Sequence, residues 1–134
     1  MGMNRVAQKI TPFLWFDDRA DMTVAFEIEG QEFVALNGGP VFKLNESVSF
    51  IVNCDTQEEV DYFWSKVSAG GEESRCGWLK DKFGLSWQVV PTVLNEMLKD
   101  KDATRAKRVM RAMLQMDKID IPTLKKAYGE TVVE

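Results

Sequence analysis

The sequence predicts an α+β fold, and three patterns lead to this prediction. Several short segments alternate large apolar residues with smaller or polar ones at a period of two, as strands do. One central segment has the start signal and the apolar spacing of an amphipathic helix. The residues after Pro91 follow helical spacing. With 134 residues, 45% hydrophobic and 28% charged, the chain can form one domain with a sizeable core.

Three strands are predicted in the first forty residues. They cover 10–16, 22–29 and 32–37, and the last two form a hairpin around Gly30. Pro12 suits the start of a strand or an edge position, because proline donates no ladder hydrogen bond. Asp17 or Asp18 has the character of a helix N-cap, yet no helical pattern follows.

The next segment predicts a strand, a helix and two more strands. The first strand covers 48–54, and the helix begins with a capping box between Thr56 and Glu59. Apolar residues then recur at helical spacing until a glycine pair ends the helix: Val60, Phe63, Trp64 and Val67, then Gly70 and Gly71. The two further strands cover 75–80 and 85–90.

Three apolar stripes after Pro91 predict short helices. They are Val93, Leu94, Met97 and Leu98; Ala106, Val109, Met110 and Met113; and Leu124, Ala127 and Tyr128. Residues 99–126 hold nine Lys/Arg and four Asp/Glu, so this window carries +5 and the rest of the chain −9. Such a basic helix could bind a membrane surface or an acidic partner, or its polar face could simply be solvated.

The two strand-rich halves have related patterns. The second half has a strand, a helix and two strands, whereas the first has three strands and no helix. A repeat with one truncated member is the simplest description.

The sequence contains no histidine. This absence excludes Ser-His-Asp and Cys-His nucleophile activation, the zinc protease helix motif and histidine-bearing metal sites. The net charge of −4 does not indicate a protein that binds nucleic acid or an anionic membrane. Cys54 and Cys76 are too few for a disulfide framework, and no stretch resembles a signal peptide or a membrane span. We therefore expect two free thiols in a soluble cytoplasmic protein.

Three stretches carry a resemblance to a known family: Ile-Thr-Pro-Phe-Leu-Trp-Phe-Asp-Asp at 10–18, Ala-Leu-Asn-Gly-Gly-Pro at 35–40, and Cys-Gly-Trp-Leu-Lys-Asp-Lys-Phe-Gly-Leu-Ser-Trp-Gln-Val-Val-Pro at 76–91. The chain resembles the PhnB-like branch of the vicinal oxygen chelate superfamily, which groups glyoxalase I, bleomycin resistance proteins and extradiol dioxygenases. The resemblance implies an α+β fold of paired βαβββ modules whose curved mixed sheets enclose a cavity, usually in a homodimer. It predicts one domain over 1–134, with modules at 1–40 and 46–91 and a C-terminal helical extension at 92–134.

The chain departs from this family pattern between Ala20 and Asp21. There the pattern would place a helix, a strand and their connections, about 25–30 residues in all. Either the protein has lost these residues or the sequence as given omits them. The first module of this chain is therefore predicted to lack its helix and the following strand.

Superfamily enzymes hold a divalent metal on four strands, and the resemblance places those positions at Thr11, Ala35, Ser49 and Gln88. None of the four is a histidine or a carboxylate, and one amide would not hold a hard or borderline cation. We therefore expect no metal and no other cofactor. Branch members often carry the label 3-demethylubiquinone methyltransferase, but this chain has no glycine-rich loop of the adenosylmethionine-binding kind.

A small-molecule cavity could persist without the metal. Strand alternation gives one face of each strand a more polar character. The candidate cavity-lining residues are Thr11, Phe13, Trp15, Ala35, Asn37, Ser49, Ile51, Asn53 and Gln88. The opposite faces, at 50–54 and 85–89, suit packing under helices. Hydrogen-bonding groups among aromatic residues are typical of a ligand pocket, but a solvated sheet face has the same pattern.

Other candidate groups have an ordinary structural alternative. Asp17 and Asp18 could be an acid–base pair or a helix cap. Cys76 could be a reactive thiol near lysines or a structural one. The glycine pairs at 38–39 and 70–71 lack the context of a phosphate loop and favour turns.

The sequence favours a protein that binds a small molecule in a metal-free cavity, with neither nucleic acid nor a membrane as partner. A metal-independent enzyme of the isomerase, lyase or transferase type is the first alternative, using Ser49, Gln88, Asn53 or Cys76. An interaction module that works through the C-terminal helices is the second. The residues do not predict the identity of the ligand.

Overall fold

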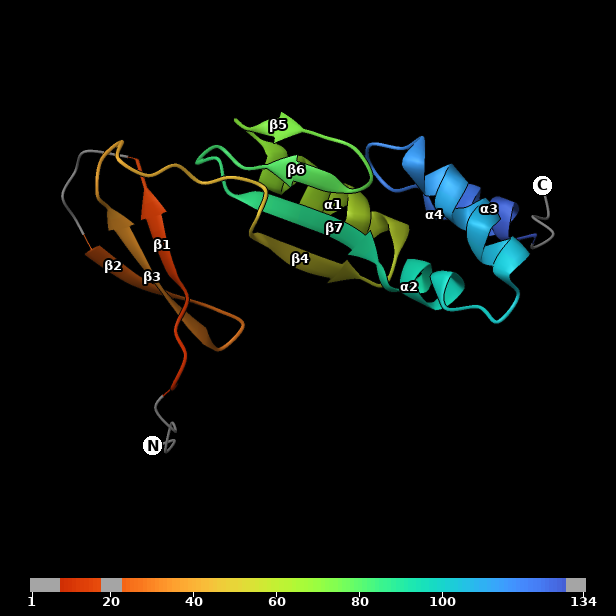
Figure 1. Cartoon of the computed structure of the whole chain (residues 1–134), viewed down its shortest axis with the longest axis horizontal. Helices are drawn as coiled ribbons and strands as arrows, with labels where there is room; N and C mark the ends of the chain where they lie inside the picture. The colour runs from red at the N-terminus through yellow and green to blue at the C-terminus, as the bar shows by residue number, and fades with distance from the viewer. Residues whose placement is uncertain (1–7, 18–22, 130–134) are drawn as a thin grey trace. The chain divides into compact units, whose positions relative to one another are not determined.

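The computed structural model describes residues 8–17 and 23–129. The chain divides into two compact units, Met1–Leu44 and Asn45–Glu134, which are named the N-terminal unit and the C-terminal unit. Figure 1 shows strands in the first unit, and a sheet and helices in the second. The fold is mixed α+β, so the predicted fold class is confirmed. No helix among the described residues is long and apolar enough to cross a membrane.

The N-terminal unit contains a three-stranded mixed sheet. Its strands β1 (Phe13–Phe16), β2 (Thr23–Ile28) and β3 (Gln31–Asn37) lie in the order β1-β3-β2. β1 runs parallel to β3, and β2 is antiparallel to β3. Leu14 and Phe33 are buried, and the ring of Phe26 stacks on that of Phe33 with 5.3 Å between centroids.

The C-terminal unit contains a four-stranded mixed sheet. Its strands are β4 (Ser49–Cys54), β5 (Glu72–Glu73), β6 (Trp78–Lys80) and β7 (Ser86–Pro91), in the order β4-β7-β6-β5. β4 and β7 are parallel, and β6 is antiparallel to both of its neighbours. The helix α1 (Gln57–Ser68) connects β4 to β5. The unit therefore begins with the βαβββ order that the resemblance implies.

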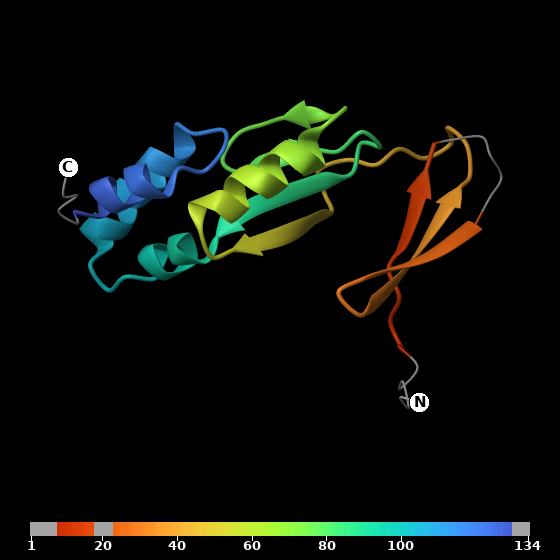
Figure 2. The same cartoon turned by 180° about the vertical axis from the view of Figure 1, so that it is seen from behind.

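The helix α1 forms where the capping signal predicts it. Thr56 has an extended backbone, and its Oγ1 accepts a hydrogen bond from the Glu59 N–H at 3.2 Å. Figure 2 shows α1 lying along one face of the sheet. The interface is a buried cluster: Cys54, Val60, Trp64, Leu79 and Val89. This packing removes one face of the sheet from solvent.

The segment between α1 and β6 differs from the sequence-based prediction. A single strand is predicted over 75–80, whereas the structure has a turn at Cys76 and Gly77 and a further short strand, β5, before it. Both turn residues have positive φ, 59° and 83°, which interrupts a strand. Their N–H groups donate to the carbonyl oxygens of Met116 and Asp117, each at 2.8 Å. A segment distant in sequence therefore helps to fix this turn.

Three helices follow β7, as predicted. They are α2 (Thr92–Leu98), α3 (Ala103–Leu114) and α4 (Ile121–Tyr128). The carboxylates of Asp102 and Asp120 accept N–H groups at the starts of α3 and α4. The apolar stripes meet in a second buried cluster: Val90, Leu94, Met97, Val109, Ile119 and Leu124. Met110 is an exception, because it is 39% exposed.

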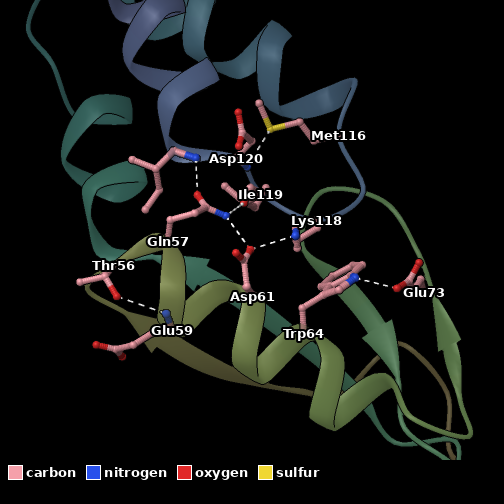
Figure 3. Close-up of polar contacts among 11 residues, drawn as sticks. Thr56, Gln57, Glu59, Asp61, Trp64, Glu73, Met116, Lys118, Ile119 and Asp120 are labelled. Atoms are coloured by element: carbon pink, nitrogen blue, oxygen red, sulfur yellow. Dashed lines mark hydrogen bonds and ion pairs between the residues drawn. The ribbon is translucent and has the colours of Figure 1, made fainter. Parts of the chain in front are cut away.

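Polar contacts join the α3–α4 connection to α1 (Figure 3). The Gln57 side chain donates to the Ile119 carbonyl oxygen at 3.0 Å and accepts the Ile121 N–H at 2.7 Å. Lys118 forms an ion pair with Asp61, 2.9 Å apart. Since Ile119 is itself fully buried, this connection ties the helical cluster to the sheet and its covering helix.

The two sheets share one pairing pattern. β1, β2 and β3 correspond to β4, β6 and β7, with one parallel and one antiparallel pair in each set. Residues 8–17 and 23–44 contain no counterpart of α1 or of β5. The predicted truncated repeat agrees with this arrangement. The candidate N-cap Asp18 lies outside the described residues, and Asp17 is exposed.

Gly77 and Gly84 provide a matched test of the turn between β5 and β6. Both have φ near +85°, at 83° and 86°, so alanine at either position incurs a left-handed strain of about 1–2 kcal/mol. A Cβ at Gly77 would also lie 2.8 Å from the Val89 carbonyl oxygen, whereas none of the described residues lies within 4 Å of a Cβ at Gly84. We expect Gly77→Ala to lower the free energy of unfolding by about 1–3 kcal/mol more than Gly84→Ala, measured by urea denaturation. Equal losses would contradict the close approach.

Candidate functional site

The pairing register determines which residues share the face of the four-stranded sheet opposite α1, named the open face. Ile51 on β4 pairs with Gln88 on β7, and Gln88 pairs with Trp78 on β6. Directly paired residues point to the same side, so these three side chains lie together. Alternation adds Ser49 and Asn53 to the same face. The four C-terminal candidate residues therefore do share one face.

Ser49 and Gln88 form a polar pair on the open face. The Gln88 Nε2 donates a hydrogen bond to Ser49 Oγ at 2.9 Å, and both residues are half-buried. The second N–H and the carbonyl oxygen of the Gln88 amide have no partner among the described residues. The pair therefore orients an amide that still has both donor and acceptor capacity.

A groove of about 240 Å³, named the sheet–helix groove, lies over this part of the open face. The sheet contributes Ile51, Asn53, Trp78, Gln88 and Val90, and the turn contributes Cys76. The helices α2 and α3 contribute Leu94, Asn95, Leu98 and Met113. Most of these side chains are apolar, with three carboxamides among them.

A second depression, of about 590 Å³, adjoins the groove and is named the β5–β6 cavity. Cys76 and Trp78 line both depressions. Lys80 and Glu46 form an ion pair among the residues that line the cavity, and this hydrogen-bonded contact raises the pKa of the lysine and lowers the pKa of the carboxyl group. The two side chains are 39% and 60% exposed, so the pair contributes little to stability.

The N-terminal candidate residues do not share one face of their sheet. Phe13 pairs with Val34, so Phe13 and Trp15 lie on the same face as Val34. Ala35 and Asn37 alternate with Val34 and lie on the other face. The register thus separates the two pairs, and their place in a ligand cavity stays a prediction.

Trp15 has local partners in the N-terminal unit. Its Nε1 donates to the Gly39 carbonyl oxygen at 2.9 Å, and its ring packs edge-on against Phe42 with 5.0 Å between centroids. A Cβ at Gly38 would lie 2.4 Å from the Trp15 ring, so this glycine serves close packing. Thr11 precedes β1 and is exposed.

A family model described as 3-demethylubiquinone-9 3-methyltransferase matches residues 21–90, a little over half of the chain. The chain belongs to this PhnB-like family. The match contains β2 and β3 and nearly all of the second βαβββ module, up to Val90 in β7, and it includes the strands of the open face. A comparison with curated proteins finds no match.

Two solved structures share the fold. The PhnB protein from Bacillus cereus is 24% identical, with a TM-score of 0.54, and the match covers 63% of this chain and 100% of that chain. Protein PA1353 from Pseudomonas aeruginosa is 15% identical, with a TM-score of 0.52, and the match covers 63% and 98% of the two chains. These likenesses concern the fold alone.

The open face of this PhnB-like chain does not fit a divalent metal. Ser49 and Gln88 stand at two of the positions where the resemblance places metal ligands, and they bond to each other. A hydroxyl and a neutral amide supply neither a negative charge nor an imidazole, and divalent cations need such ligands. Among residues 8–17 and 23–129, no three Cys, Asp or Glu side chains form a group that could hold a metal ion.

Several residues that line the groove are not among the candidates predicted from the sequence. Trp78 could have been found, because the antiparallel pairing of its strand with 85–90 places it beside Gln88 once the register is known. Leu94, Leu98 and Met113 could not, since only tertiary packing brings α2 and α3 over the sheet. Their apolar spacing predicts burial and not a role as a pocket wall.

The two cysteines are both free, as predicted, and they differ in environment. Cys54 is fully buried, and burial raises its thiol pKa from 9.0 to about 11. Cys76 is half-buried and lines both depressions. Cys54 is thus a structural thiol, and Cys76 is the one that reagents can reach.

We expect iodoacetamide at pH 8 to modify Cys76 in the folded protein and Cys54 only after unfolding, as measured by peptide mass spectrometry. Equal labelling of both thiols in the native state would contradict this assignment.

The raised pKa of the Cys54 thiol also means that Cys54 adds stability below pH 9, and that this contribution is lost as the pH rises from 9 towards about 11. Cys54→Ala should therefore reduce the loss of stability at alkaline pH.

Proposed function

We propose that the protein binds a small molecule with an aromatic or apolar body in the sheet–helix groove, without a metal ion. The observation that carries the proposal is the oriented Ser49–Gln88 pair at the edge of a mostly apolar groove. Ligand sites typically combine an apolar lining with a few well-placed polar groups.

The size of the groove limits the ligand. Its volume of about 240 Å³ falls just below the range of roughly 300–1,000 Å³ typical of drug-sized ligands. A single ring with short substituents fits such a space. Trp78 offers an aromatic surface, and the Gln88 amide can both donate to and accept from a polar substituent.

Methyl transfer, which the family description names, has less support than binding. The connection from β4 to α1 consists of Asp55 and Thr56, and neither is a glycine. Adenosylmethionine sites of the doubly wound kind use a glycine-rich loop at such a strand-to-helix connection.

We further propose that the protein acts as a cytoplasmic homodimer, as the resemblance implies.

A thermal-shift screen with monocyclic aromatic compounds, benzyl alcohol among them, tests the proposal. A ligand that binds only the folded state raises the unfolding temperature, and the stabilisation grows with the logarithm of the ligand concentration above Kd. Gln88→Ala should weaken a hit about tenfold in calorimetric titration, because one polar contact is lost. Gln115→Ala, an exposed matched control at the end of α3, should have no effect.

The screen also separates binding from catalysis. Binding predicts stabilisation with the compound recovered unchanged. The proposal fails if no compound stabilises the protein, or if Gln88→Ala and Gln115→Ala bind the hits equally well. Conversion of a hit into product would instead identify an enzyme.

A further inference from the structure

Ser86 carries the one buried side-chain oxygen or nitrogen that lacks a hydrogen-bond partner in the described part of the chain. The residue is 0% exposed and lines the β5–β6 cavity. A buried hydroxyl without a partner is destabilising, and most such groups in native structures find a partner. The unpaired Ser86 Oγ can therefore accept a hydrogen bond from a group that enters this cavity.

The surroundings of Ser86 follow from the strand register. Ser86 on β7 pairs directly with Lys80 on β6, and Lys80 pairs with Glu72 on β5. These three side chains therefore point to the open face. Glu46 reaches the same place from the turn before β4 and forms the ion pair with Lys80. One lysine is thus flanked by two glutamates.

The carboxylates beside Ser86 favour a cation. Glu46 and Glu72 both lie next to the Lys80 ammonium on the open face, and Arg75 also lines the cavity. Glu73 alternates with Glu72, and its carboxylate accepts the Trp64 indole N–H of α1 at 2.8 Å, so it points to the other face. The ring of Trp78 is the kind of aromatic surface that attracts a cation.

The ion pair that borders the hydroxyl can be exchanged. Lys80 and Glu46 are both partly exposed, and exposed ion pairs of long side chains are held weakly. An incoming ammonium group can take the place of the Lys80 ammonium on Glu46. The Lys80 side chain can then turn towards solvent, so that the ligand can reach Ser86.

We infer that the β5–β6 cavity binds the ammonium group of a small primary amine whose apolar body lies in the adjoining sheet–helix groove. The ammonium group donates to Ser86 Oγ and to the Glu46 carboxylate. Trp78, which lines both depressions, lies beside the link between the two parts of the ligand. The inference rests on the proposed function, since it names the chemical class of ligand for the same open face.

Calorimetric titration of the full chain with three probes of matched shape tests the inference. They are benzylamine, which is protonated at neutral pH, benzyl alcohol, which is neutral, and benzoate, which is an anion. We expect benzylamine to bind about tenfold more tightly than benzyl alcohol and benzoate to bind most weakly. High salt should reduce the preference for the amine, because salt screens the carboxylates.

Variants assign the effect to residues. Ser86→Ala should weaken benzylamine binding about fivefold and leave or raise the unfolding temperature, since it removes an unsatisfied buried hydroxyl. Glu46→Gln should also weaken amine binding, whereas Lys80→Met should strengthen it by removing the competing cation. The exposed residues Ser65 and Glu58 on α1 supply the controls Ser65→Ala and Glu58→Gln, which should change nothing.

Each contrary outcome overturns the inference in a recognisable way. Equal affinity for benzylamine and benzyl alcohol, with both weakened by Gln88→Ala, would leave the groove as a binding site and remove the amine preference. Tighter binding of benzoate would reverse the charge assignment. Failure of all three probes to bind, or identical behaviour of Ser86→Ala and Ser65→Ala, would also overturn the inference.

Discussion

The packing of α1 on one face of the four-stranded sheet is the constraint on which the rest of the C-terminal unit depends. It buries a cluster that includes Cys54, Val60 and Val89. Because side chains alternate along a strand, this choice of face also sends Ser49, Gln88 and Trp78 to the opposite side. The position of the candidate site is therefore a consequence of the core. A shift of register by one residue would exchange the two faces.

Local signals in the sequence account for most of the fold. The capping box at Thr56, the alternating strands and the apolar stripes after Pro91 act over a few residues, so they can be read without tertiary information. The turn at Cys76 and Gly77 could not be predicted, because its N–H groups are held by carbonyl oxygens some forty residues away. The C-terminal candidate residues lie on one face of their sheet, as alternation along the strands predicts. Phe13 and Ala35 lie on opposite faces of the N-terminal sheet, because the parallel register of β1 and β3 places them there, and the sequence does not specify that register.

The open face has a groove, and its polar groups are not those of a metal site. Ser49 and Gln88, which the resemblance places at two metal-ligand positions, are hydrogen-bonded to each other and leave part of a neutral amide unpaired. α2 begins directly after β7, and the α3–α4 connection is fastened to α1 through Gln57, so the helices that bound the groove are held to the sheet. On the same face, the buried Ser86 hydroxyl has no partner among the described residues. It lies beside the partly exposed ion pair of Lys80 and Glu46.

Indole and side-chain amide NMR signals give the most direct test of ligand binding on the open face. Trp78 lies on that face, whereas the indole N–H groups of Trp64 and Trp87 are hydrogen-bonded to Glu73 and Asp81, and both rings pack in the cluster under α1. In a titration with benzyl alcohol we expect the Trp78 indole and the Gln88 amide signals to shift together, while those of Trp64 and Trp87 stay in place. Shifts confined to Trp64 and Trp87, or none at Trp78 and Gln88, would contradict binding on the open face.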